Sequence, residues 1–98
     1  MKPKLTRAQE AVFVRLVCGQ TLARYPDGVY GRPWVWTDGL HDGAANPRRA
    51  TVDALVAKGV VEIISLGTRR GEVALLTDEG KALVRQIWPA LADVRGIP

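Results

Sequence analysis

The chain has 98 residues, which is enough for one domain with a single modest core. Hydrophobic residues make up 47% of it and charged residues 24%, as in ordinary globular proteins. No apolar run approaches the roughly 20 residues of a membrane span, and the N-terminus lacks an apolar signal core. Cys18 is the single cysteine, which excludes an internal disulfide and a multi-cysteine zinc site. We therefore expect a single cytoplasmic domain over residues 1–98, with no contact to a membrane.

The net charge is +4, and the basic residues are clustered. Such clusters attract a polyanion by steering and counterion release, whereas the alternative is a solubilising surface. The positions favour the polyanion, because the arginines fall at the ends of predicted elements. The clusters are Lys2, Lys4 and Arg7, then Arg48 and Arg49, then Arg69 and Arg70.

The first predicted element is an amphipathic helix from about Arg7 to Ala23. Thr6 and Gln9 have the spacing of a capping box. Cys18 flanks the apolar stripe of this helix, and we expect it to be a small buried hydrophobe, not a nucleophile. The stripe consists of Val12, Phe13, Leu16 and Val17.

The segment from Arg24 to Ala45 is rich in glycine, proline and aromatic residues. Tyr25–Gly28 has the sequence of a type I turn, and a short strand or irregular hairpin is expected around Val35. We expect Trp34 and Trp36 to point to opposite faces, so that at most one belongs to the core. The other ring would then cover a hydrophobic edge or stack on a base or a partner.

The one histidine, His41, lies near Asp38 and Asp42 in this segment. Three such residues can be drawn as metal ligands, but a lone histidine in a glycine-rich loop is typical of a solvated turn. No nucleophile, base and orienting group can be proposed together, so no catalytic residue, metal or cofactor is predicted. We expect that the protein is not an enzyme.

A second helix is predicted from Asn46, with Asn46 as N-cap, Pro47 at the first helical position and Gly59 as the stop. Its buried stripe is Val52, Leu55 and Val56.

Arg48, Arg49 and Thr51 fall in the first turns of this helix. Arginines there oppose the helix dipole, a small cost that a bound polyanion relieves. The structural alternative is an intrahelical pair between Arg49 and Asp53.

Two strands are predicted next, Val60–Leu66 and Glu72–Leu76. The loop Gly67–Gly71 joins them and places Arg69 and Arg70 at an exposed tip, which suits contact with phosphate or a minor groove. Charged hairpin tips are also common without a function.

Thr77 is predicted to cap a last helix. Trp88–Pro89 is expected to kink or break that helix. The apolar residues of this last helix follow helical spacing: Leu83, Ile87, Leu91 and Val94.

The stretches TVDALVAKGVVEI, GTRRG and LLTDEGKAL resemble the recognition helix, wing and following helix of winged helix-turn-helix proteins, in particular the MarR-like group. The match runs from Pro47 to about Val84. In that family the recognition helix enters the major groove and the wing touches the neighbouring minor groove or backbone. The family places a helix before the recognition helix, where this chain has the broken segment from Tyr25 to Asn46.

The resemblance implies an α+β winged-helix domain: helix, short strand, recognition helix, two-stranded wing and C-terminal helix. The expected function is binding of double-stranded DNA in transcriptional control. The expected DNA-binding residues are Arg48, Arg49, Thr51, Lys58, Thr68, Arg69 and Arg70.

The alternative is a protein-binding module on the same scaffold, such as a phage- or plasmid-encoded inhibitor of a host defence protein. Its anchors would be Tyr30, Trp34 and Trp36, because aromatic residues are frequent hot spots. An exposed face at the C-terminal helix, with Ile87, Trp88 and Leu91, would form a homodimer seam or close the core over the first helix.

Overall fold

The computed structural model describes residues 4–24, 34–37, 46–67 and 70–98. These residues form a small α+β fold, as predicted, and none of their helices has the length and apolar character needed to span a bilayer. The elements follow the order α1 (Arg7–Val17), β1 (Leu22–Arg24), β2 (Trp34–Trp36), α2 (Arg49–Ala57), β3 (Val61–Ser65), β4 (Glu72–Leu76), α3 (Asp78–Ile87) and α4 (Pro89–Val94).

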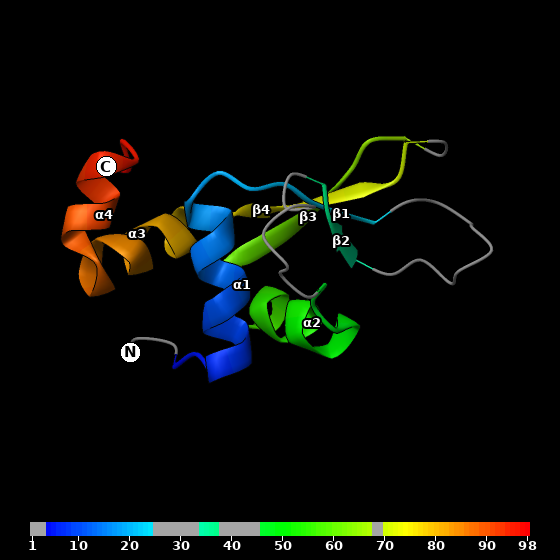
Figure 1. Ribbon diagram of the computed structural model, residues 1–98, viewed down its shortest axis with the longest axis horizontal. Helices are drawn as coiled ribbons and strands as arrows, with labels where there is room; N and C mark the ends of the chain where they lie inside the picture. Colours follow the sequence, from blue (N-terminus) through cyan, green and yellow to red (C-terminus); the bar gives the residue numbers. More distant parts are fainter. Residues whose placement is uncertain (1–3, 25–33, 38–45, 68–69) are drawn as a thin grey trace.

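The four described strands form one antiparallel sheet in the order β2-β1-β4-β3. Strand β1 is central and pairs with β2 and β4, so the N-terminal and C-terminal halves share one sheet. The β3–β4 hairpin projects at the end of the molecule opposite α4, while α2 lies beside α1 (Figure 1). The most deeply buried large side chains come from helices and strands alike: Trp34, Phe13, Leu22, Leu55, Val52, Val60 and Val84.

Helix α1 begins as predicted but ends earlier. The capping box is present, with the Gln9 N–H donating to Thr6 Oγ1 (3.2 Å) and the Thr6 N–H to Gln9 Oε1 (3.1 Å). The predicted end at Ala23 is wrong. Gly19 adopts a φ of 88°, which terminates the helix and allows the chain to return as β1. Cys18 is the C-cap and is exposed, so its predicted burial is also wrong.

Both tryptophans of β2 belong to the core, contrary to the prediction. Trp34 is 1% exposed and Trp36 is 4% exposed. Side chains alternate along a strand with a period of two, so residues two apart lie on the same face and Val35 points to the other. The short strand expected around Val35 is confirmed.

Helix α2 begins at Arg49, so the predicted start at Asn46 and Pro47 is wrong. The Asn46 side chain is engaged elsewhere, because its Oδ1 accepts the Trp36 N–H at 3.2 Å. Arg48 is the N-cap and makes no side-chain capping bond. The predicted stop is confirmed, since Gly59 follows the C-cap with a φ of 77°.

The two hairpin strands and the Thr77 cap of α3 are confirmed, and β3 is shorter than predicted by one residue at each end. The helix is interrupted at Trp88–Pro89, as expected, so that α3 and α4 are separate helices. Trp88 packs on Phe13 with ring centroids 6.0 Å apart, so part of the C-terminal apolar face closes the core over α1. Ile87 stays exposed.

The start of α3 packs directly on the chain between α2 and β3. The Thr77 N–H donates to the Val60 carbonyl at 3.1 Å, and Thr77 Oγ1 donates to the Gly59 carbonyl at 2.6 Å. Gly80 lies against the Val60 carbonyl as well, since a Cβ there would be 2.2 Å from Val60 O. Only glycine allows this approach of α3, which in turn fixes where α2 ends.

Replacing Gly80 by alanine is expected to destabilise the fold by about 1–3 kcal/mol, because backbone must shift to admit the methyl group. Urea unfolding followed by circular dichroism measures this loss. Gln86→Ala, at an exposed position of the same helix, is the control and should leave the unfolding midpoint unchanged. An unchanged midpoint for Gly80→Ala would contradict the close packing.

Candidate nucleic-acid interface

The N-terminus of α2 carries the first pair of predicted DNA-binding arginines. Arg48 and Arg49 are both exposed. The helix has no side-chain cap and no acidic residue in its first turn, whereas a threonine caps both α1 and α3. Within the described residues, no side chain caps the first N–H groups of α2, while the Thr51 N–H donates to the Arg48 carbonyl at 3.0 Å. This arrangement suits an anion such as phosphate.

Arg49 also contacts an acidic residue on its own helix. Its Nε lies 3.8 Å from Asp53 Oδ2, so the intrahelical pair expected between Arg49 and Asp53 is present. The two side chains are 80% and 57% exposed, and an ion pair with that exposure is weak. Arg49 can therefore turn to another anion at little cost. Thr51, the third predicted residue of this helix start, is half-buried.

Lys58 is held at the junction of α1 and α2. Its Nζ donates to Gln9 Oε1 at 2.5 Å and also to the Lys4 carbonyl. The structure thus separates Lys58 from the exposed arginines at the opposite end of α2. A phosphate contact by this lysine would have to replace or share these bonds.

The β3–β4 hairpin carries the second group of predicted residues. The Leu66 N–H donates to the Gly71 carbonyl at 2.9 Å, and the Arg70 N–H to the Gly67 carbonyl at 3.2 Å. Gly67 and Gly71 have φ values of 110° and 81°, which explains the two glycines that flank the tip. Arg70 is exposed. Thr68 and Arg69 lie outside the described residues.

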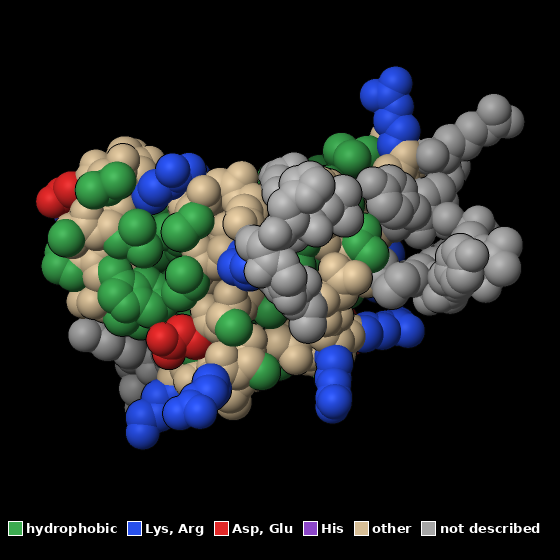
Figure 2. Space-filling model, in the orientation of Figure 1, with side chains coloured by type: hydrophobic (Ala, Val, Ile, Leu, Met, Phe, Trp, Pro, Cys, Tyr) green, Lys and Arg blue, Asp and Glu red, His purple; other side chains and the backbone are tan. Residues whose placement is uncertain are grey.

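The space-filling view shows where the basic side chains gather. Lys and Arg side chains project along the margin beneath α1 and α2 and again at the hairpin end (Figure 2). Hydrophobic side chains gather instead over the α3–α4 end of the same view. The apolar side chains are thus gathered at one end of this face, whereas basic side chains lie along its margin at both ends (Figure 2).

Two arginines that were not among the predicted site residues, Arg24 and Arg15, contact core residues of the fold. Arg24 Nε and Nη2 donate to Glu72 Oε1 at 3.1 and 2.8 Å, and its guanidinium lies 4.6 Å from the centre of the Trp34 ring. The Arg15 guanidinium lies 5.1 Å from the centre of the Trp36 ring. The Arg24 contacts follow from the register of β1 with β2 and β4, whereas Arg15 lies on α1 and meets Trp36 only through the packing of that helix.

Two of the three aromatic residues expected on a protein-binding surface are core residues. Trp34 and Trp36 are buried, and Tyr30 lies outside the described residues, as do Asp38, His41 and Asp42. Across the described ranges, no three His, Cys, Asp or Glu side chains come together as a metal site.

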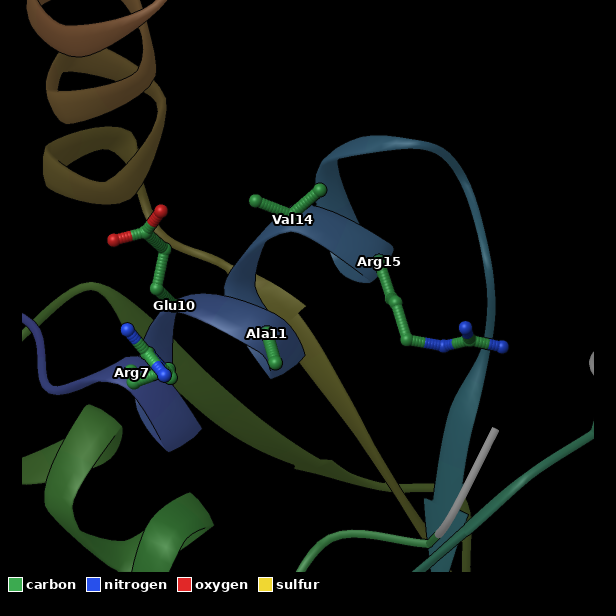
Figure 3. Close-up of a pocket in the computed structure, with 5 residues that line it drawn as sticks. All are labelled: Arg7, Glu10, Ala11, Val14 and Arg15. Atoms are coloured by element: carbon green, nitrogen blue, oxygen red, sulfur yellow. The ribbon is translucent and has the colours of Figure 1, made fainter. Parts of the chain in front are cut away.

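A broad hollow of about 670 Å³ lies on the outward side of α1. Arg7, Glu10, Ala11, Val14 and Arg15 line it (Figure 3). The Arg15 side chain extends away from Arg7 and Glu10. These residues offer no nucleophile or general base near a second catalytic group, so the hollow suggests no reaction.

Comparison with known proteins finds no matching family model, no matching curated protein and no matching solved structure.

The contacts of Arg24 are expected to contribute measurably to the free energy of unfolding. Arg24→Met removes the guanidinium, loses the stacking on Trp34 and leaves Glu72 unpaired, with an expected loss of about 1–2 kcal/mol. Urea unfolding provides the measurement. Arg70→Met, at an exposed tip position, is the matched control. Equal midpoints for both variants would show that the Arg24 contacts contribute nothing.

Proposed function

We propose that the chain binds double-stranded DNA as a small transcriptional regulator, using the N-terminus of α2 and the tip of the β3–β4 hairpin. The observation that carries the proposal is the uncapped start of α2, with Arg48 and Arg49 exposed beside it. The positive end of the helix dipole and two exposed guanidinium groups together suit the binding of a phosphate.

The two ends of α2 would then have different roles. An α-helix fits the major groove of B-DNA, and arginine reads guanine through a bidentate contact. Arg49 is proposed to contact a base, with Arg48 on a phosphate and Thr51 in support. Lys58, at the other end of the helix, would add a backbone contact.

The hairpin would supply the second contact. Arg70 is exposed at its tip, and Thr68 and Arg69 complete the proposed set. Cations on a projecting hairpin can reach phosphates or the narrow minor groove beside the helix site.

The arrangement of elements supports the winged-helix assignment within this proposal. Helix α2 leads directly into a two-stranded antiparallel hairpin, and β1 pairs with the second strand of that hairpin. Strand β2, which pairs with β1, lies in the segment where the family has a helix. The Asn46 bond to Trp36 then ties the residues before α2 to the sheet. We propose that this bond helps to position the start of α2.

Binding to a labelled random duplex should weaken with salt, because each neutralised phosphate releases counterions. The logarithm of the binding constant should fall with a slope of about −0.9 per phosphate contacted. Arg48→Ala and Arg70→Ala should each reduce that slope by about one unit. Lys81→Ala, which removes one exposed charge from α3, is the control and should leave the slope unchanged. Fluorescence anisotropy provides the measurement. Absence of binding at low salt would refute the DNA proposal.

Asp53 should oppose binding, because its carboxylate lies beside Arg49 on the proposed DNA face. Asp53→Ala is expected to tighten binding to random DNA by roughly fivefold at low salt, since two unit charges at contact distance in water interact by about 1 kcal/mol. Asp93→Ala, which removes a carboxylate on α4, is the control and should have no effect on affinity. Weaker binding by Asp53→Ala would mean that Asp53 orients Arg49 productively.

A further inference from the structure

The two edge strands of the sheet, β3 and β2, differ in how their outward-pointing backbone groups are bonded. In antiparallel sheets, hydrogen-bonded pairs alternate along the strands. The Leu66 N–H bonds to Gly71, so the next bonded pair along β3 is Ile64 with Val73. The N–H and C=O groups of Val61, Ile63 and Ser65 must then point away from β4. No described strand pairs with this side of β3. Val61 is 2% exposed, whereas Ile63 is half-buried and Ser65 is exposed, so the accessible part of the edge is at Ile63 and Ser65.

At the opposite edge, a side chain accepts one outward donor of β2. The Thr37 N–H donates to the Thr21 carbonyl at 3.0 Å, so the backbone of the neighbouring residue Trp36 points away from β1. The Trp36 N–H donates to Asn46 Oδ1. The outward donor of Trp36 on this short edge is therefore satisfied within the chain.

The accessible part of the β3 edge lies beside exposed apolar side chains. Ile64 is 38% exposed, Leu66 is 46% exposed and Leu75 is 47% exposed. Ile64 and Leu66 share one face of the hairpin because they are two residues apart, and the strand register places Leu75 beside Glu62 on the same face. Neither lysine nor proline occurs in β3, although these residues commonly protect an edge strand from pairing.

We propose that β3 pairs antiparallel with β3 of a second copy, forming a two-fold dimer with one continuous sheet. A second copy is the proposed partner because the order of charged and apolar side chains along β3 matches itself in one antiparallel register. That register is centred on Ile64, where the exposed isoleucines of the two copies face each other. Ile63 then exchanges backbone hydrogen bonds with Ser65 of the second copy.

The alternative registers are less favourable. A register centred on Glu62 sets two carboxylates directly opposite, which repel each other. A register centred on Ile63 sets each exposed Ile64 against a Glu62 carboxylate and pairs no exposed isoleucines. The register centred on Ile64 also sets each Glu62 against an apolar side chain, Leu66 of the second copy. Of the three registers, however, it alone pairs the two exposed Ile64 side chains, and it keeps the two Glu62 carboxylates furthest apart.

Charge substitutions at the two-fold axis test the pairing. Sedimentation equilibrium should give a mass of two chains for the unmodified protein, and Ile64→Lys and Ile64→Glu should each give a mass of one chain. Mixing the two variants should restore a mass of two chains, because the introduced ammonium of one would face the introduced carboxylate of the other. Ile87→Lys places the same charge on the exposed isoleucine of α3 and should leave the dimer intact. Circular dichroism establishes that each variant is folded.

A crosslink tests the register. Ile64→Cys in a Cys18→Ala background should form a disulfide between chains on mild oxidation, because non-hydrogen-bonded pairs bring their Cβ atoms close enough. Glu62→Cys in the same background should not. A monomeric unmodified protein, a dimer disrupted by Ile87→Lys and not by Ile64→Lys, or a dimer without the Ile64→Cys crosslink would each overturn the proposal. None of these outcomes depends on DNA binding.

Discussion

The burial of two tryptophan rings from a strand of three residues is the interaction on which the rest of the structure depends. Trp34 and Trp36 both face the core. Replacing a buried tryptophan by alanine costs about 3–5 kcal/mol, a large part of the roughly 5–15 kcal/mol that stabilises a typical domain. The guanidinium groups of Arg24 and Arg15 lie over the two rings, so these two basic residues make contacts that stabilise the fold.

Local signals in the sequence predicted much of the fold. The capping box of Thr6 and Gln9, the Thr77 cap, the stop at Gly59 and the break at Trp88–Pro89 all appear in the structure. Each depends on groups within a few residues of one another, so the sequence contains the whole interaction. The exposure of Arg48, Arg49 and Arg70 followed from the same reasoning, because it requires only that these residues lie at the ends of elements.

The errors concern groups whose partners are distant in sequence. Strand β1 was assigned to a helix because its pairing with Trp36 and Ala74 depends on strands that follow it in the chain. Asn46 was taken for a helix cap because the competing donor, the Trp36 N–H, is ten residues away and is brought near only by the sheet. The burial of both tryptophans has a different cause, since the period of a strand was enough to place both rings on one face.

One hydrogen bond connects the two proposals made for this chain. By accepting the Trp36 N–H, Asn46 satisfies one outward donor of the β2 edge, whereas no described strand pairs with the outer edge of β3. The same bond commits the best capping side chain near α2 to the sheet, so that Arg48 takes the N-cap position without a capping bond. A cap at this point would satisfy the helix N–H groups and compete with phosphate for them. The lack of a capping bond at Arg48 is therefore also the feature on which the proposed phosphate contact at the start of α2 rests.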